Sequence, residues 1–258
     1  MLTRARDEDV PCKILGRGAN VLVSDDGFDG VVVRLDAPAF RRMEFRDHHV
    51  EVGAGTDLTA LTRICVRRGL AGLEAMAGIP ATVGGAVRMN AGGRGGEFSD
   101  VVRSVRVMAA DGAVEEWPRA RCGFGYRHSQ LDSCIVLSAA LELRGDDPQR
   151  VRARFESFLS EKQRTQPLAE HSAGCVFKNP PGQSAGALID RAGLKGAACG
   201  QAVVSHRHAN FIVADRAATA SDVLGLIDIV REGVRRAFDV ELQLEIDVWH
   251  PLGEGSLV

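Results

Sequence analysis

Apolar runs that alternate with glycine and aspartate turns predict a series of short strands in the first third of the chain. We expect these strands at 11–15, 21–23, 31–35, 42–46 and 50–53. The pattern then changes to a helical period over 57–68, where Leu58 and Leu61 fall on one face. Thr56 is the predicted N-cap of this helix and Gly69 is its predicted stop.

Strand and helix patterns are mixed in the rest of the chain. Predicted strands lie at 101–109, 114–117, 135–143, 175–177, 210–214 and 241–249, and predicted helices at 149–164, 184–192 and 221–238. Because these elements follow no regular βαβ alternation, the pattern predicts an α+β fold. The breaker at 145–148 predicts a boundary between a domain over 1–146 and a smaller domain over 147–258. The closing strand either stays in the second domain or returns to the first.

Residues 71–96 form a glycine- and alanine-rich stretch with little charge, and two interpretations of it are open. One is a mobile surface loop. Flexible linkers lack apolar anchors, however, and this stretch contains Leu73, Met76 and Ile79. Because glycine allows the backbone to approach a partner closely, the other interpretation is a structured loop that wraps a large flat ligand.

The composition argues against several classes of protein. Of the 258 residues, 45% are hydrophobic and 26% charged, and the formal net charge of −2 gives no indication of a nucleic-acid or membrane-surface partner. No run approaches the ~18 apolar residues that a membrane span needs, and the charged N-terminus is not a secretory signal. The six cysteines show neither zinc-ligand spacing nor a disulfide pattern, so we expect reduced thiols, no metal site and a cytoplasmic location.

Four glycine-rich turns are candidate anion-binding loops. The turn Gly16-x-Gly18-x-Asn20 follows a predicted strand, but a strand also follows it, so alone it reads as a plain strand-turn-strand. Gly53-Ala54-Gly55-Thr56 leads into a helix N-terminus, where backbone N–H groups favour an anion. Together with Gly84-Gly85 and Asn90-Ala91-Gly92, these turns predict several backbone-donor loops that suit a diphosphate attached to a wide ring system.

Several longer motifs resemble one family. They are Gly16-x-Gly18-x-Asn20-x-Leu22-Val23-Ser24-Asp25, Ala77-Gly78-Ile79-Pro80-x-Thr82-Val83-Gly84-Gly85-Ala86, Phe124-Gly125-Tyr126-Arg127-x-Ser129, Ser172-Ala173-Gly174-Cys175-Val176-Phe177-Lys178-Asn179-Pro180 and His208-Ala209-Asn210-Phe211. Over residues 14–249 the chain resembles the UDP-N-acetylenolpyruvoylglucosamine reductases, and its block 78–86 is similar to the wider FAD fold of the vanillyl-alcohol-oxidase type. The resemblance implies an FAD-binding domain of two α+β subdomains over 1–146, followed by a smaller α+β substrate-binding domain over 147–258.

The resemblance also implies an oxidoreductase of peptidoglycan precursor synthesis. NADPH would reduce non-covalently bound FAD, and the flavin would reduce UDP-N-acetylglucosamine enolpyruvate to UDP-N-acetylmuramate. The implied partners are the nucleotide sugar and NADPH, with neither nucleic acid nor membrane. The implied cofactor-binding residues are Gly16, Gly18, Asn20, Gly53, Gly55, Thr56, Ile79, Pro80, Gly84, Gly85, Asn90, Ala91 and Gly92.

Three residues match the family's catalytic positions. Hydride transfer to the methylene carbon of an unsaturated carboxylate leaves negative charge on that carboxylate, which the planar guanidinium of Arg127 would stabilise. Cys175 stands where the family has a serine that gives the α-carbon its proton, and a thiol is the stronger acid. Glu245 matches the second acid, with a polarising or orienting role. Each has an alternative: Arg127 as an ordinary exposed arginine, Cys175 as an inert buried cysteine, and Glu245 as part of a solvated strand face.

Four residues are implied to bind the substrate: Tyr126, Arg164, Lys178 and Asn179. Arg164 is a candidate for the substrate diphosphate, and ordinary solvated charge at a helix end is its alternative. Tyr126, the one tyrosine of the chain, is expected to pack on the sugar or the nicotinamide unless it is a core ring.

Some features depart from the family's pattern. Relatives carry a Thr-Phe-x-x-Gly-Gly strand and a helix before the Gly16 turn, so either the true start lies upstream of Met1 or the flavin subdomain lacks a strand, which would weaken FAD retention. Ala19 replaces a serine, Arg94 a tyrosine, and Gln243-Leu244 the usual Glu-Pro. The short link from Arg127 to Cys175 suggests the compact form of the enzyme. Two alternatives are therefore open: a flavin- or nucleotide-sugar-binding homologue without turnover, and another FAD oxidoreductase of the same fold.

Overall fold

The computed structural model describes residues 2–251, which divide into two compact units. The first unit contains Gly30–Glu161 and the residues before Gly18, and the second contains Gly18–Asp29 and the residues from Lys162 onward. The predicted boundary after residue 146 therefore differs from the observed one. Helix α4 (Pro148–Thr165) belongs to the first unit over most of its length.

Side-chain contacts explain why α4 stays with the first unit. Val151 is fully buried, and Phe158 packs against the apolar core of that unit. Arg154 bridges two carboxylates, Glu74 and Asp146, at 2.8 Å each. Because Glu74 is almost completely buried, loss of Arg154 would leave a buried carboxylate without its cation, so the ion pair keeps the helix with this unit. The breaker in the sequence thus marks the start of a helix and not a change of domain.

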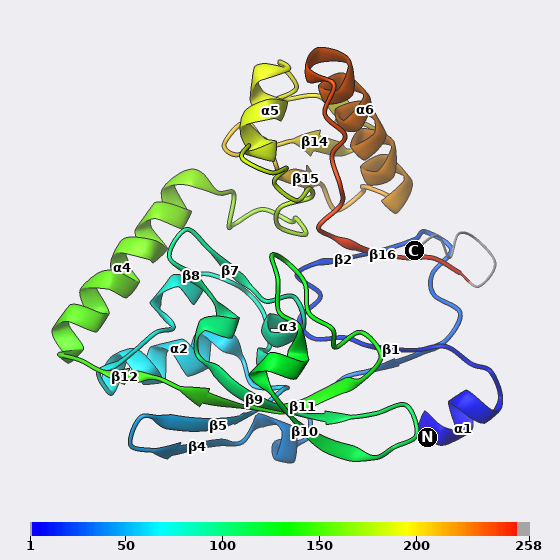
Figure 1. Ribbon diagram of the computed structural model, residues 1–258. Helices are drawn as coiled ribbons and strands as arrows, with labels where there is room; N and C mark the ends of the chain where they lie inside the picture. Colours follow the sequence, from blue (N-terminus) through cyan, green and yellow to red (C-terminus); the bar gives the residue numbers. More distant parts are fainter. Residues whose placement is uncertain (1, 252–258) are drawn as a thin grey trace. The chain divides into compact units, whose positions relative to one another are not determined.

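A five-stranded antiparallel sheet forms the centre of the first unit (Figure 1). Its strands, in the order β10-β9-β11-β5-β4, are β10 (Val114–Pro118), β9 (Val102–Met108), β11 (Ile135–Glu142), β5 (His49–Gly53) and β4 (Met43–Arg46). In β5, Val50 and Val52 are buried whereas His49 and Glu51 are exposed, so alternation directs one face of the sheet into the core. The two hairpins and the strand predicted at 135–143 are confirmed, with slightly shifted ends.

Helices α2 (Leu58–Arg67) and α3 (Val83–Arg88) pack into the core with the sheet, on the same side of it (Figure 1). The predicted N-cap of α2 is one residue too early. Asp57, and not Thr56, accepts a backbone N–H of the first turn at 2.8 Å. The predicted stop is confirmed, because Gly69 follows the helix with a φ of 67°.

Shorter elements fill the connections of the first unit. They are α1 (Leu2–Asp7), β1 (Cys12–Ile14), β3 (Val31–Val33), β6 (Leu70–Ala71), β7 (Gly92–Gly93), β8 (Gly96–Glu97), β12 (Arg144–Gly145) and the 3-10 turns η1 (Pro38–Arg41), η2 (Glu74–Met76), η3 (Phe98–Asp100) and η4 (Arg119–Cys122). The stretch 71–96 therefore contains regular structure, and it buries Leu73, Met76 and Val83. These observations favour the structured-loop interpretation over the mobile surface loop.

Two helices and a three-stranded antiparallel sheet form the second unit. Its elements are α5 (Ala185–Arg191), α6 (Ala220–Phe238) and, in sheet order, β13 (Ala198–Cys199), β14 (Ala202–Val204) and β15 (Ile212–Ala214). Thr219 caps α6 in a capping box with Asp222. Asp25 accepts the N–H groups of Ala220 and Ser221 at 2.6 and 2.9 Å, so it ties the Gly18–Asp29 segment to this helix.

The closing strand is shorter than predicted. Only β16 (Asp247–Trp249) forms a ladder, in parallel with β2 (Val21–Val23), and both strands belong to the second unit. Residues 241–246 precede this ladder, and their β-pairing within the described residues is an isolated bridge between Leu244 and Phe177. The predicted strand 175–177 likewise forms isolated bridges in place of a ladder.

The described residues contain neither a helix long and apolar enough to cross a membrane nor a group of three or more His, Cys, Asp or Glu side chains placed to hold a metal ion. Two of the cysteines are core residues. Burial raises the pKa of Cys65 to about 12 and that of Cys122 to about 11, so both thiols stay protonated at neutral pH. Their role is packing, as expected for small apolar side chains.

Candidate active site

Three of the predicted glycine turns meet in the first unit. The turn at Gly16 lies against Thr82, since a Cβ on Gly16 would stand only 2.7 Å from the Thr82 hydroxyl. The loop after β5 is bonded to the start of α3. The Thr56 carbonyl accepts the Val83 N–H at 2.9 Å, and the Ala54 carbonyl accepts the Gly84 N–H at 2.8 Å. These contacts make one platform from segments that are far apart in the sequence.

The glycines of this platform serve the packing of its own backbone. A Cβ on Gly53 would lie 2.2 Å from the Phe40 carbonyl oxygen, and one on Gly55 would lie 1.9 Å from that of Leu35. No side chain fits at either position. The N–H groups of Gly53, Gly55, Thr56, Gly84, Gly85, Asn90 and Ala91 are all bonded inside the protein. These amides are therefore already used inside the protein and are not the free backbone donors that the sequence predicted for these three turns.

Unused donors lie at the Gly16 turn of the platform. Within residues 2–251, the backbone N–H groups of Gly16 and Arg17 donate no hydrogen bond. The same holds for Gly18, Ala19 and Asn20, which belong to the second unit. Thr56 is 3% exposed, and its Oγ1 is the one buried side-chain nitrogen or oxygen in the described part of the chain that has no partner. Because buried polar atoms are normally bonded, this hydroxyl indicates a ligand atom as its partner.

Asn90 connects the glycine-rich stretch to the loop of Arg127. It is 1% exposed, with a φ of 43°. Its Nδ2 donates to Glu97 Oε2 at 2.7 Å and to the Gly125 carbonyl at 3.0 Å, while its Oδ1 accepts the Ser99 N–H at 3.0 Å. Both Nδ2 protons are thus in use inside the protein. The side chain braces two loops and has no donor left for a cofactor.

Tyr126 and Arg127 form the tip of a tight turn that two backbone bonds close between Gly125 and His128. Arg127 has a φ of 53°, in the left-handed region that costs a non-glycine residue ~1–2 kcal/mol. Its Nη2 donates to the Gly92 carbonyl at 2.9 Å. Tyr126 is 46% exposed, so the alternative of a core ring is wrong. Strained backbone of this kind is concentrated at functional sites.

The second unit brings Cys175 and Glu245 onto neighbouring segments. The Glu245 N–H donates to the Val176 carbonyl at 2.8 Å, and Asn20 Nδ2 donates to the Glu245 carbonyl at 2.9 Å. Cys175 and Glu245 are both half-buried, so neither the fully buried cysteine nor the solvated strand face describes them. Two predicted catalytic residues and one predicted cofactor residue therefore lie together in this unit.

The predicted substrate residues of the second unit have different settings. Lys178 is half-buried, and its N–H donates to the Gln243 carbonyl at 2.8 Å. Asn179 is exposed, and its Oδ1 accepts the Ala185 N–H at the start of α5 at 2.9 Å. Arg164 is exposed in the last turn of α4, where the helix dipole favours a cation with or without a substrate nearby. Lys178 and Asn179 both lie in the segment of Cys175, whereas Arg164 does not.

Comparison with known proteins decides the family. The family model for the C-terminal domain of UDP-N-acetylenolpyruvoylglucosamine reductase matches residues 166–249, and an FAD binding domain model matches residues 1–117. The UDP-N-acetylenolpyruvoylglucosamine reductase of Heliobacterium modesticaldum is 44% identical over 251 residues, which are 96% of this chain and 80% of the relative. The chain belongs to the UDP-N-acetylenolpyruvoylglucosamine reductase family.

A further relative and a solved structure from the same reductase family are also similar to this chain. The UDP-N-acetylenolpyruvoylglucosamine reductase of Bacillus subtilis is 37% identical over 93% of this chain and 80% of its own length. The crystal structure of the Thermus caldophilus reductase matches with a TM-score of 0.85 and 42% identity, over 96% of this chain and 88% of that chain. The α+β fold with an FAD-binding domain, the FAD cofactor and the reductase activity are therefore confirmed.

The first unit of this reductase fits an FAD cofactor. The unpartnered Thr56 hydroxyl and the unused amides of Gly16 and Arg17 are donors of the kind that an anionic diphosphate takes up. The guanidinium of Arg17 is held by an ion pair with Asp57, with Nη1 2.6 Å from Oδ2. Half-buried Ile79 lies in the loop that leads to α3 and offers apolar contact.

Sequence reasoning missed the residues that hold the reductase's site residues in place. Glu97 supports Asn90, and Asn210 bonds the backbone of Phe177. Neither role is visible in a local pattern, because the partners lie in separate loops. The one available signal for Asn210 was its place in the motif His208–Phe211.

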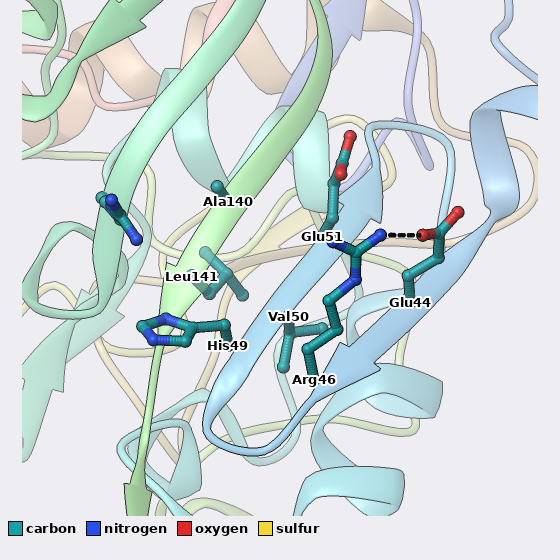
Figure 2. Close-up of a pocket in the computed structure, with 8 residues that line it drawn as sticks. Glu44, Arg46, His49, Val50, Glu51, Ala140 and Leu141 are labelled. Atoms are coloured by element: carbon teal, nitrogen blue, oxygen red, sulfur yellow. Dashed lines mark ion pairs between the residues drawn. The ribbon is translucent and has the colours of Figure 1, made fainter.

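A shallow hollow of about 160 Å³ lies on the five-stranded sheet and is separate from these residues (Figure 2). Glu44, Arg46, His49, Glu51 and Arg103 contribute to its lining, with an ion pair between Glu44 and Arg46 at 3.6 Å. Its charges are mixed, and no predicted site residue of the reductase lines it.

Proposed function

We propose that this reductase converts UDP-N-acetylglucosamine enolpyruvate to UDP-N-acetylmuramate with NADPH as the reductant, through Arg127, Cys175 and Glu245. One observation supports the choice of residues: the Glu245 N–H donates to the Val176 carbonyl, so the segment of the orienting acid pairs with the segment of the proton donor. Bound FAD supplies the hydride that it takes from NADPH. We also expect a cytoplasmic enzyme without a nucleic-acid partner, in keeping with its net charge of −2 and scattered cysteines.

Arg127 acts on the charge that the reaction creates. When the methylene carbon of the substrate accepts a hydride, negative charge moves onto the carboxylate. A guanidinium fixed by the Gly92 carbonyl and by its tight turn stabilises that charge more in the transition state than in the ground state. The cost of strain at φ 53° is consistent with a side chain held for this purpose.

Cys175 completes the reduction by giving its proton to the α-carbon. The S–H bond breaks, a C–H bond forms, and the thiolate regains a proton from solvent. Glu245, on the neighbouring segment, orients the thiol toward the α-carbon. Lys178 and Asn179 follow in the same segment and bind the substrate, as Tyr126 and Arg164 do from their loop and helix end.

Two half-reactions test this proposal. Flavin absorbance of the purified protein should bleach on addition of NADPH and recover on addition of the enolpyruvyl substrate. We expect Cys175→Ala to bleach normally and to lose the recovery by at least ~100-fold, the lower bound of general acid catalysis. Cys175→Ser should keep measurable recovery. Full recovery in the alanine variant would remove Cys175 from the mechanism, and bleaching without recovery in the unmodified protein would refute the proposed function.

A further inference from the structure

The side chain of Asn210 bonds both backbone groups of one residue in the Cys175 segment, Phe177. Its Oδ1 accepts the Phe177 N–H at 3.0 Å, and its Nδ2 donates to the Phe177 carbonyl at 2.8 Å. Its own carbonyl accepts the Val176 N–H at 2.9 Å. Asn210 is 3% exposed and Phe177 is 1% exposed, so water does not compete for these bonds.

The amide of Asn210 takes the place of a neighbouring strand. The segment around Cys175 has no ladder of its own and forms isolated bridges, from Cys175 to Phe211 and from Phe177 to Leu244. A side-chain amide offers one acceptor and one donor in the spacing of a peptide group, so it completes the pairing at the position where the backbone ladder is interrupted. The residue itself is fixed, because its N–H donates to His208 Nδ1 at 3.3 Å.

Phe177, the residue that Asn210 holds, lies between residues with assigned roles. Cys175 precedes Phe177 by two residues, and Lys178 follows it directly. On the other side of the same segment, the Val176 carbonyl and the Lys178 N–H bond to the strand of Glu245. Because Asn210 holds the N–H and the carbonyl of Phe177, loss of its amide would let the backbone around Phe177 rotate or slip and would move Cys175 relative to Glu245.

We propose that Asn210 is a positioning residue for the reduction, because its amide sets where the Cys175 thiol stands relative to Glu245. This inference rests on the proposed function of Cys175. Asn210 acts through Phe177 and touches no reacting atom. A misplacement of a reacting group by about 1 Å costs up to ~100-fold in rate, so loss of the amide should slow the step that uses Cys175.

The test compares three variants in both half-reactions. Asn210→Ala removes both side-chain bonds. Asn210→Asp has the same size, keeps the acceptor for the Phe177 N–H and loses the donor, so it carries the test if the alanine variant does not fold. Thr219→Ala is the matched control: it removes the N-cap of α6 in the same unit and weakens the fold without touching the Cys175 segment.

We expect both Asn210 variants to bleach with saturating NADPH at a rate within twofold of the unmodified protein. Recovery on adding the enolpyruvyl substrate should be slower by ~10- to 100-fold, in kcat more than in KM. Thr219→Ala should change neither rate. Equal losses in both half-reactions, or no loss in either, would show that Asn210 is structural and overturn the inference.

A second measurement does not depend on turnover. Iodoacetamide labelling, followed residue by residue with peptide mass spectrometry, should label Cys175 several-fold faster in Asn210→Ala than in the unmodified protein, with exposed Cys12 as the internal reference. If the unmodified protein is never reoxidised by substrate, the proposed function fails on its own. The labelling rate then still decides the inference: an unchanged Cys175 rate would mean that Asn210 does not hold this segment.

Discussion

Replacing Thr56 by valine separates cofactor binding from folding, because the two effects have opposite signs. The Thr56 hydroxyl is buried between β5 and α2 and has no partner within the described residues. Valine has the same shape and substitutes a methyl group for the hydroxyl. The protein without FAD therefore loses an unsatisfied polar atom, whereas the protein with FAD loses a hydrogen bond to the ligand.

The magnitudes follow from the cost of an orphaned polar group. A buried hydroxyl without a partner destabilises a fold by ~1–3 kcal/mol, so Thr56→Val should raise the unfolding free energy of the FAD-free protein by ~1–2 kcal/mol. A hydrogen bond to a charged group contributes ~1.5–3 kcal/mol. Since 1.4 kcal/mol is a factor of ten, the Kd for FAD should rise by ~10- to 100-fold.

Urea unfolding of the FAD-free protein and a fluorescence titration with FAD give the two quantities. Thr62→Val is the control, because Thr62 is also buried and its Oγ1 already donates to the Leu58 carbonyl at 2.8 Å. We expect the Thr62 variant to keep its FAD affinity and to gain no stability. If Thr56→Val is less stable than the unmodified protein and binds FAD equally well, the hydroxyl has a protein partner and the reasoning fails.

Three further predictions concern the site residues. Arg127→Gly should be ~1 kcal/mol more stable to urea than Arg127→Ala, because glycine relieves the strain at φ 53°; the reverse order, which is usual for glycine, would contradict it. Glu245→Gln should slow single-turnover reoxidation by substrate at least ~10-fold while NADPH still bleaches the flavin, and near-normal reoxidation would remove its role. Burial, with a smaller contribution from Lys195, lowers the pKa of His208 in the folded protein, so the unfolded chain binds the proton first as the pH falls. The unfolding free energy should therefore decrease below about pH 6.5. Urea unfolding should show that His208→Gln makes this pH dependence weaker.

Local patterns predicted those elements whose partners are close in sequence. The hairpins of β4 with β5 and of β9 with β10 follow from alternation and a turn, both of which are written in the sequence. The α2 cap shows the limit of such patterns. Thr56 and Asp57 are both good N-caps, and the choice of Asp57 coincides with a bridge to Thr82, which no local pattern contains.

Tertiary contacts decided the elements that the sequence misplaced. Helix α4 remains with the first unit because Arg154 reaches a carboxylate eighty positions away. The segment Gly18–Asp29 joins the second unit because Asp25 caps α6, nearly two hundred positions later. The strand predicted at 175–177 carries the right residues, yet a side-chain amide completes its pairing. Periodicity describes backbone ladders and cannot reveal such a substitute.

The glycine turns correctly indicated segments that lie together, but the glycines are needed there for a different physical reason than the predicted one. Glycine was expected there so that free amides could approach a ligand, but the amides of Gly53 and Gly55 are bonded, and their missing side chains make room for the carbonyls of Phe40 and Leu35. That close packing of backbone on backbone places Thr56 where its hydroxyl finds no partner among residues 2–251. A side chain at either glycine would therefore disturb the platform itself, and the loss of FAD would be a consequence of that disturbance and not of a blocked ligand.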